Sequence, residues 1–507
     1  MARHSIKRAN TLLAILAYSL SATATDYTSK SQADILGVYS RAVQHDAKLS
    51  AARHAYQAQL EAVPQARSGL LPSLTAGATL EETRLEHSDA LASRNRSGTV
   101  IRADLSQPLF RAERWYQLQA AKASVAQAGL ELAAQEQTLI LSTAQAYFEV
   151  LRQLDTLAAS KAEEIALQHQ LEQTQGQMDN GASSITDVLD VQAAYDNARA
   201  NRQLAQRKVE DAYEALARLT KQPYSSIAGM GHHIPIEAPT PNDAQAWVNT
   251  ATQQNLPLLA SYHAVTAAEE TILQHKSGHA PTLDVVASYR KGDNDNFGYR
   301  NSTEFGRTDY QSDMAQSSIG LELNIPLFSG GMTQSKVRES TERLYQTQSE
   351  QEDLRREVAL KTRNYHRAIN SDIEQVIARR QNIRSNQKSL EANKVGLEFG
   401  SRNIVDVVNA QRQLYSAVRD YNNSRYDYIL NTLNLKQAAG TLSPNDLAYL
   451  SNYLSKNHDP ERDFLPPEMS EQDHNSRQSR GEEQLNPTGT ASAMAPTENK
   501  PASRKAY

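Results

Sequence analysis

The feature that most constrains this chain is that its two halves follow one plan. The hexapeptide Ile185–Asp190 (ITDVLD) returns as Ile404–Asn409 (IVDVVN), about 219 positions later. At similar offsets, the other matching segments are Arg67–Leu74 with Lys276–Leu283, and Leu105–Phe110 with Leu323–Phe328. Two copies are too few for a solenoid, which needs three or more stacked repeats. We therefore expect an internal duplication that builds a pseudo-symmetric object.

Each half predicts a helix, two strands, a very long helix and a shorter helix. Apolar and polar residues alternate over the four expected strands, as in strands with one apolar face. These strands are at about 73–87, 99–110, 282–290 and 316–328. Polar, turn-rich segments at 88–98 and 291–313 separate the strands of each pair and predict solvent-facing loops.

The long helices are expected at 112–178 and 332–397, and the shorter ones at 184–220 and 403–439. The first contains no proline and only two glycines, Gly129 and Gly176, so it predicts a rod of roughly 100 Å. Its leucines and valines recur every seven residues, which is a coiled-coil period. The apolar stripe is narrow, so a rod of this kind needs packing neighbours on both sides.

The expected domain organisation follows from these elements. Residues 1–24 resemble an export signal, with positive charges at Arg3, Lys7 and Arg8, an apolar core too short for a transmembrane helix, and an A-x-A site at residues 22–24. The first repeat is then 25–220, a connector 221–256, and the second repeat 257–440. An equatorial segment, 441–455, precedes a polar tail, 456–507, that we expect to be disordered.

Several classes of function are excluded by composition and motifs. The chain has no cysteine, and its formal net charge of -5 is spread without a basic block, which argues against nucleic acid as a partner. No catalytic or phosphate-binding motif is present, so we expect neither an enzyme nor a cofactor. We interpret His232 and His233 as surface polar residues rather than metal ligands, and Glu163 and Glu164 as a solvated helix face.

Four strands with one apolar face cannot form a complete barrel, because membrane-spanning barrels begin at eight strands. Open sheet edges are also not tolerated in lipid. Several copies that pool their strands would solve both problems, and strand counting alone allows a dimer of eight strands or a trimer of twelve. The alternative is a secreted or periplasmic coiled-coil structural protein, such as an adhesin stalk. That alternative explains the heptads but leaves the four alternating strands unexplained.

The chain resembles the TolC family of outer-membrane export and efflux channel proteins from about Gln32 to Leu450. The resemblance rests on SGLLPSL, QPLF, Thr138–Leu151, Ile185–Asp196, Ile325–Met332 and Gly400–Tyr415. It implies an α+β membrane protein: a homotrimer with a twelve-strand outer-membrane β-barrel, a periplasmic α-helical barrel and a mixed equatorial belt. Such a duct would pass proteins (type I secretion) or small toxic compounds. Its implied partners are outer-membrane lipid, a periplasmic adaptor and an ABC, RND or MFS-type inner-membrane transporter.

Both hexapeptides follow a helix break, at Asn180-Gly181 and at Gly400. Glycine there predicts a left-handed helix end, and Ser184 or Asn403 then begins the next helix, so each hexapeptide is expected at the tip of an antiparallel helix pair. Aspartates three apart share a helix face. In a symmetric assembly they would form a carboxylate ring that attracts cations. The alternative is that these residues only stabilise the helix N-terminus through its dipole.

The resemblance assigns roles to individual tip residues. Asp406 and Asn409 match the two pore-constricting aspartate positions of the family, so the ring at Asn409 should be weaker than in the family pattern. Arg402, Thr186 and Asp187 match residues that tie neighbouring helix pairs shut. Leu397 stands at the position of a companion tyrosine and lacks its hydroxyl, so closure should depend more on an Arg402–Thr186 contact and on packing. Asp190 has no acidic counterpart in the family and would restore charge lost at Asn409.

Overall fold

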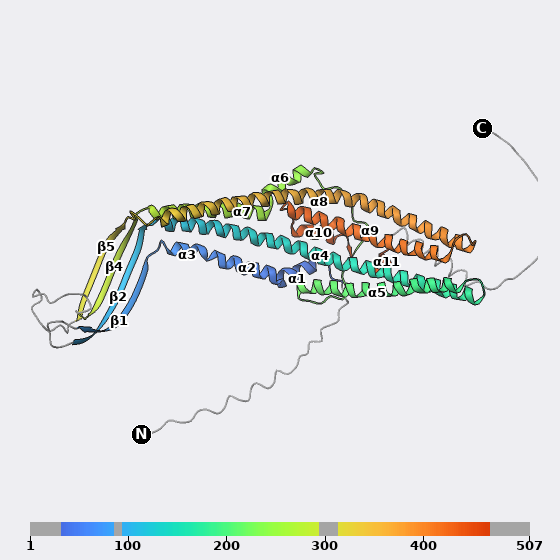
Figure 1. The fold of residues 1–507 in the computed structure, drawn as a ribbon, viewed down its shortest axis with the longest axis horizontal. Coiled ribbons are helices and arrows are strands. Elements are labelled where there is room, and N and C mark those ends of the chain that lie inside the picture. Colours follow the sequence, from blue (N-terminus) through green and yellow to red (C-terminus); the bar gives the residue numbers. More distant parts are fainter. Residues whose placement is uncertain (1–31, 86–93, 294–312, 467–507) are drawn as a thin grey trace, which may run out of the picture.

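The computed structural model describes residues 32–85, 94–293 and 313–466. The expected signal peptide lies outside the described residues, as do residues 467–507 of the expected tail and most of the two loops between strands. The described chain is long and narrow (Figure 1), with a sheet at one end and two helix turns at the other.

The helices and strands alternate along the chain in blocks. The helices are α1 (Ile35–His45), α2 (Ala47–Leu60), α3 (Ala62–Ser68), α4 (Ala112–Asp179), α5 (Ile185–Thr220), α6 (Ala244–Gln254), α7 (Leu256–Lys276), α8 (Met332–Glu398), α9 (Ile404–Ala438), α10 (Pro444–Ser451) and α11 (Pro460–Asp463). The strands are β1 (Ser73–Leu85), β2 (Arg94–Phe110), β3 (Gly229–Met230), β4 (Thr282–Asp293), β5 (Asp313–Asn324) and β6 (Leu454–Ser455), with a 3₁₀ turn at Ser277–His279.

Strands β1, β2, β4 and β5 form one antiparallel sheet in that order. Its register puts Leu74, Leu105, Ala287 and Ile319 in one row. Leu74 and Ile319 are 72% and 81% exposed, so the apolar face of the sheet is uncovered in a single chain. Strands β1 and β5 are the two edges, and within the described residues each pairs on one side only.

The strand boundaries differ from expectation in three of the strands. Strand β2 begins at Arg94 rather than 99, and β4 continues to Asp293 rather than 290. Strand β5 starts at Asp313 and ends at Asn324, whereas 316–328 was predicted. Pro326 follows this end, and a proline has no N–H to donate to a sheet ladder. The strands therefore extend further into the polar segments near the loops than their composition indicates. The mainly apolar residues 325–328, in contrast, were wrongly included in the predicted strand.

A partly buried ion pair joins the sheet to the helices. Arg111 is the N-cap residue of α4, and its Nη2 and Nε lie 2.7 and 2.9 Å from Oδ2 and Oδ1 of Asp284 on β4. Asp284 is 5% exposed. A two-pronged arginine–carboxylate contact fixes orientation as well as distance, so it sets the direction in which α4 leaves the sheet.

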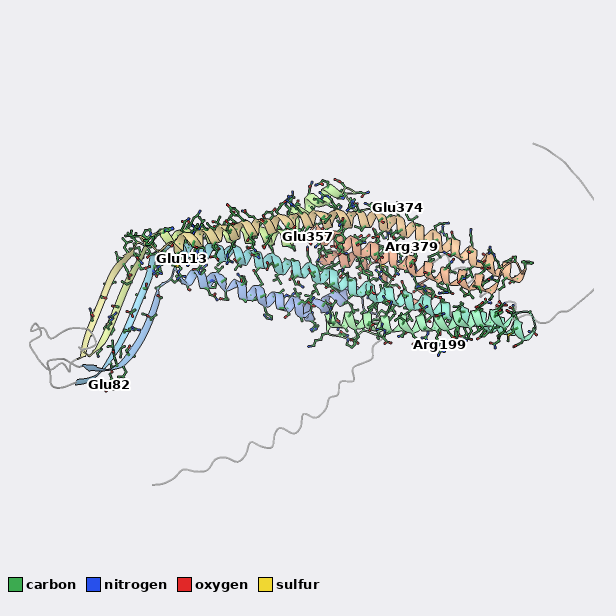
Figure 2. All side chains as sticks on the ribbon, viewed as in Figure 1. Glu82, Glu113, Arg199, Glu357, Glu374 and Arg379 are labelled. Atoms are coloured by element: carbon green, nitrogen blue, oxygen red, sulfur yellow. The ribbon has the colours of Figure 1, made fainter. Side chains whose placement is uncertain are left out.

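Helices α4 and α8 run from the sheet to the far end of the molecule (Figure 1), with α5 folded back along α4 and α9 along α8. Charged side chains such as Glu357, Glu374 and Arg379 lie along α8 (Figure 2). Within the described residues, no helix contains a stretch both long enough and apolar enough to cross a bilayer. The largest apolar core lies midway, where Tyr147 and Phe148 of α4 meet Tyr426 of α9.

The prediction that the chain is disordered from residue 456 is wrong for residues 456–466. Strand β6 pairs with β3 of the connector, and the short helix α11 follows it. Phe464 is 3% exposed and packs among residues of α4, α8 and α9. Asn422 of α9 donates from Nδ2 to the carbonyl oxygen of Phe464 at 2.9 Å. One buried aromatic residue and its hydrogen bonds order a segment whose composition is otherwise polar.

Candidate channel gate at the helix tips

Both helix turns at the far end close in the same way. Gly181 and Gly400 have φ of 75° and 67°, the left-handed region that glycine adopts without a steric penalty. The N–H of Ala182 donates to Gln177 O, and that of Ser401 to Gly396 O, both at 2.8 Å. These bonds satisfy carbonyls left open by the helix ends. The predicted helix ends and N-caps are confirmed at both turns.

The hexapeptide occurs twice because each copy forms the first turns of a helix, α5 or α9. Ser184 and Asn403 are the N-caps of α5 and α9, and each accepts from the backbone N–H three residues on, at Asp187 and Asp406. Each aspartate returns the contact by accepting from the backbone N–H of its N-cap residue. This reciprocal pair of bonds is a capping box. The acidic third residue of each hexapeptide therefore fixes where the returning helix begins.

The two capping aspartates differ in how fully they are engaged. Asp187 Oδ2 lies 2.8 Å from Ser184 Oγ, 3.1 Å from Ser184 N and 3.2 Å from Ser183 Oγ. These hydrogen bonds, the Ser184 hydroxyl first, hold the pKa of Asp187 below its usual value. Within the described residues, Asp406 Oδ2 accepts a single hydrogen bond, from the Asn403 N–H at 3.3 Å. Asp406 therefore keeps more lone pairs for a cation or for a neighbouring chain.

The other predicted gate residues lie around these caps. Thr186, Asp190, Arg402 and Asn409 are exposed. The Thr186 hydroxyl is 2.6 Å from Ser184 Oγ. In the described part of a single chain no hydrogen bond joins Arg402 to Thr186.

Leu397 packs between the two helix pairs of the chain. It packs against a small cluster in which Leu167, Val191 and Ala198 of the first helix pair meet Ile404 and Val408 of the second. This cluster joins the α4–α5 pair to the α8–α9 pair just behind the two tips. Apolar contacts of this kind have no directional preference, so they hold the tips together without fixing one orientation.

Further from the tips, α4 and α9 are joined by polar contacts. Glu163 is 6% exposed, and its Oε2 lies 3.2 Å from Nη1 of Arg419, so the interpretation of Glu163 as a solvated residue is wrong. Arg152 and Asp427 form a second pair, at 2.7 Å. The only signal in the sequence was that Glu163 lies at a heptad position that can face another helix. Without knowing the neighbouring helix, such a position cannot be distinguished from one on the surface.

A buried acid lies in the same contact between helices. Tyr426 donates from its hydroxyl to Asp155 Oδ2 at 2.8 Å. Asp155 is 5% exposed, and burial raises its pKa to about 7, against the opposing effect of the Tyr426 bond. Removing a carboxylate from water disfavours its charged form. This acid therefore changes protonation near neutral pH.

His232 is buried in part rather than a surface residue as predicted, whereas His233 is exposed. The His232 ring stacks on Tyr421, with 6.1 Å between centroids, and His232 Nε2 donates to the carbonyl oxygen of Asp463 at 2.9 Å. Burial lowers the pKa of His232 to about 4. Among the described residues, no group of three or more His, Cys, Asp or Glu side chains is arranged to hold a metal ion.

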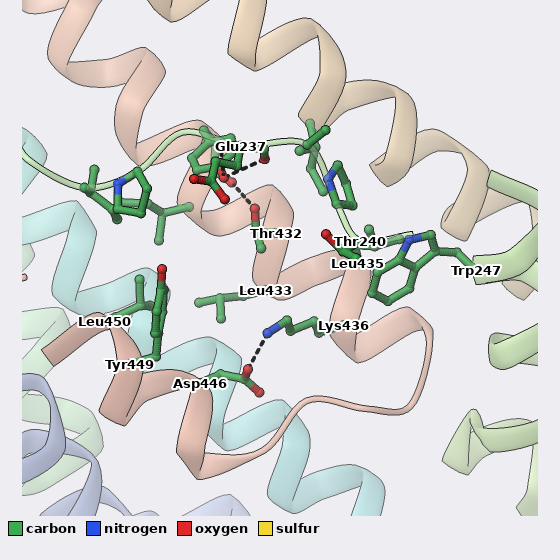
Figure 3. A pocket seen from close by; sticks show the side chains of 17 residues that line it. Glu237, Thr240, Trp247, Thr432, Leu433, Leu435, Lys436, Asp446, Tyr449 and Leu450 are labelled. Atoms are coloured by element: carbon green, nitrogen blue, oxygen red, sulfur yellow. Dashed lines mark hydrogen bonds and ion pairs between the residues drawn. The ribbon is translucent and has the colours of Figure 1, made fainter. Parts of the chain in front are cut away.

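A pocket of about 330 Å³ opens between the connector, α9 and α10. Its wall includes Trp247 and Tyr449, and the ion pair of Lys436 with Asp446 crosses it (Figure 3). The Tyr428 hydroxyl donates to Glu237 O at 2.9 Å and lies 3.0 Å from Glu237 N. These contacts attach the connector to α9. Neither the pocket nor its contacts were predicted from the sequence.

A protein family described as "Outer membrane efflux protein" matches residues 38–220 and 247–441 of this chain. Outer membrane protein TolC of Vibrio cholerae is 36% identical over 412 residues, which is 81% of this chain and 91% of that protein. The chain belongs to the outer membrane efflux protein family. Outer membrane protein TolC of Escherichia coli is 33% identical over 88% of this chain and 90% of its own length.

Other matches extend the comparison. Alkaline protease secretion protein AprF of Pseudomonas aeruginosa is 26% identical over 83% of this chain and 87% of that protein. A solved structure of CusC has a TM-score of 0.70 at 15% identity, over 80% of this chain and 92% of the other. The outer membrane protein VceC of Vibrio cholerae gives 0.68 at 16% identity, over 80% and 96%. These two structures share the fold.

Membership of the family establishes the general function. The protein is an outer-membrane exit channel of an efflux or type I secretion system, with its helical part in the periplasm, and it works with an adaptor and an inner-membrane transporter. It is a duct and not an enzyme. The alternative of a secreted or periplasmic coiled-coil stalk is thereby set aside.

Proposed function

We propose that three copies of this chain form one continuous duct, with twelve strands in the outer membrane and twelve helices in the periplasm. Each copy provides a four-strand sheet with two single-sided edges and an uncovered apolar face. Pairing β1 of one copy with β5 of the next leaves no open sheet edge. Open edges are not tolerated in lipid, because their backbone groups would lack hydrogen-bond partners. The single observation that carries the proposal is that β1 and β5 are both long, edge-exposed strands at the same end of the molecule.

The helix tips form the gate of this duct. Asp406, with most of its lone pairs unused, forms a ring of three carboxylates at the narrow periplasmic mouth, and Asn409 adds a ring of amides. Arg402 contacts Thr186 or Asp187 of a neighbouring copy and holds the mouth shut. Leu397 keeps the two helix pairs of one copy together at rest. Asp190 contributes further negative charge near the mouth, and Asp187 acts chiefly as the cap of α5.

The cargo is of the kind exported in a single step. The named relatives include an alkaline protease secretion protein and a proteases secretion protein, which supports the passage of unfolded protein. The family name supports the efflux of small toxic compounds by the same duct. The energy comes from an ABC, RND or MFS-type inner-membrane transporter, and a periplasmic adaptor opens the mouth.

Disulfide crosslinking tests the assembly, since the chain has no cysteine of its own. Thr75→Cys on β1 is combined in turn with cysteine at Gln316, Ser318 and Gly320 on β5. Within one copy two strands separate β1 from β5, a distance of about 14 Å, which is beyond the reach of a disulfide. We expect oxidation to yield dimers and trimers for at least one pair. Single-cysteine variants are the control, and monomers from all three pairs would contradict the proposal.

A further inference from the structure

Two arginines lie side by side on the polar face of the sheet. The register pairs Arg102 of β2 directly with Arg290 of β4. Their row continues to Gly77 of β1 on one side and to Gln316 of β5 on the other. Both arginines are exposed, and neither has an ion pair or side-chain hydrogen bond within the described residues. Like charges directly opposite each other destabilise a sheet, so this placement calls for a compensating group.

The row is built to hold the first guanidinium in place. A Cβ atom on Gly77 would lie 3.1 Å from Arg102 Nε, so the arginine side chain lies across β1 at the one position without a side chain. Gln316 adds an amide to the same row. The row thus contains two positive charges, of which the first lies against Gly77, and a neutral hydrogen-bonding group, and no carboxylate.

The carboxylate in the row next to the arginines, on the side toward the helices, does not cancel this charge. The adjacent row toward the helices contains Asp104 with Thr75, Ser288 and Ser318, about 7 Å away along the strands. Asp284 lies further in that direction and is engaged by Arg111. The two arginines therefore outnumber the one carboxylate of the neighbouring row. An arginine keeps its charge at any physiological pH.

We propose that this row, Gly77–Arg102–Arg290–Gln316, is a binding site for multivalent anions inside the outer-membrane part of the duct. The inference rests on the proposed trimer, in which the face opposite the apolar one lines the lumen. The threefold axis then puts three arginine pairs around one level of the lumen. Rings of arginine select anions, and guanidinium groups bind phosphate oxygens in pairs. The duct would carry positive charge at its exterior end and negative charge at its periplasmic mouth.

Block of single channels in planar bilayers tests this site, with sodium tripolyphosphate added to one side at a time. We expect wild-type channels to be blocked more strongly from the exterior side, where the arginine rings lie. The double variant R102Q/R290Q should need at least about tenfold more tripolyphosphate for the same degree of block. The matched control R102K/R290K keeps the charge but loses the paired guanidinium contacts, and its block should lie between those of wild type and R102Q/R290Q. Gln316→Glu leaves both arginines in place, puts a carboxylate in the row and should weaken the block in the same way.

The outcomes separate the two proposals. Channels that conduct, yet show equal block in wild type, R102Q/R290Q and Gln316→Glu, would overturn the anion site and leave the trimeric duct standing. Absence of any heat-labile oligomer and of any conductance would overturn the duct itself.

Discussion

Glu163 of α4 and Arg419 of α9 form an ion pair between two helices that belong to different helix pairs of the chain. Oε2 and Nη1 are 3.2 Å apart, and the side chains are 8% and 25% exposed. Behind the tips the two helix pairs meet through apolar residues alone among the contacts described, whereas here directional, charged contacts are added to an apolar cluster of α4, α8 and α9. We infer that the polar contacts fix the part of the tunnel near the equator and leave the tips free to move.

Glu163→Gln should therefore destabilise the contact between α4 and α9. Removing one partner of a buried pair leaves the other charge without compensation, at a cost of about 1–3 kcal/mol. Thermal unfolding measured in detergent should show a lower Tm. The control is Glu339→Gln, which breaks an exposed pair with Arg343 within one helix and should change Tm very little. Equal effects of the two substitutions would contradict the assignment.

Asp406→Ala should mainly change ion selectivity, whereas Asp187→Ala should mainly lower stability. Asp406 has the less engaged carboxylate, so its loss should reduce the preference of single channels for cations over anions, measured as a reversal potential in a salt gradient. Asp187 mainly caps α5, and its loss should cost about 1 kcal/mol of stability with a smaller change in selectivity. Unchanged selectivity in Asp406→Ala would remove the carboxylate ring from the account.

Asp155 should make stability depend on pH near neutrality. Its pKa in the folded chain is raised to about 7 from 3.8, so its protonated form is favoured by folding. The stabilisation is complete below about pH 4 and is lost as pH rises through about 7. We expect the Tm of wild type relative to Asp155→Asn to fall over this range. A difference that does not vary with pH would contradict the burial of a titrating acid.

His232 should act in the opposite direction. Its pKa is lowered to about 4 from 6.5, so the stability it contributes is present above about pH 6.5 and is lost as pH falls through about 4. His232→Gln keeps a polar side chain that does not titrate, and it should lose less stability than wild type between those limits. His233→Gln is the control, because His233 is exposed. An identical acid response in all three proteins would rule out this role.

Phe464→Ala should loosen the C-terminal segment that crosses α4 and α9. A buried aromatic reduced to alanine typically costs 3–5 kcal/mol, and we expect about that range here. Limited proteolysis should then cut near residues 456–466, where wild type is protected. Leu465→Ala is a milder neighbouring change, since Leu465 is only partly buried. Equal proteolysis of wild type and Phe464→Ala would contradict a structural role for the segment.

The sequence predicted the long helices within a residue or two, because heptads and the absence of proline leave few alternatives over such lengths. It also predicted both helix caps, since glycine followed three residues later by serine or asparagine is a local signal. It could not predict that Glu163, Asp155 and His232 are buried. Those environments are created by residues far away in the sequence, Arg419 for Glu163, Tyr426 for Asp155 and Tyr421 for His232, and no local pattern encodes them.

The central claim is that one chain is an incomplete part of a closed cylinder and needs two more copies. Native mass spectrometry of the detergent-solubilised protein tests it most directly. We predict a single dominant species of three times the mass of the purified chain, converted to one chain by heating. A dominant monomer or dimer that conducts ions in bilayers would contradict the account.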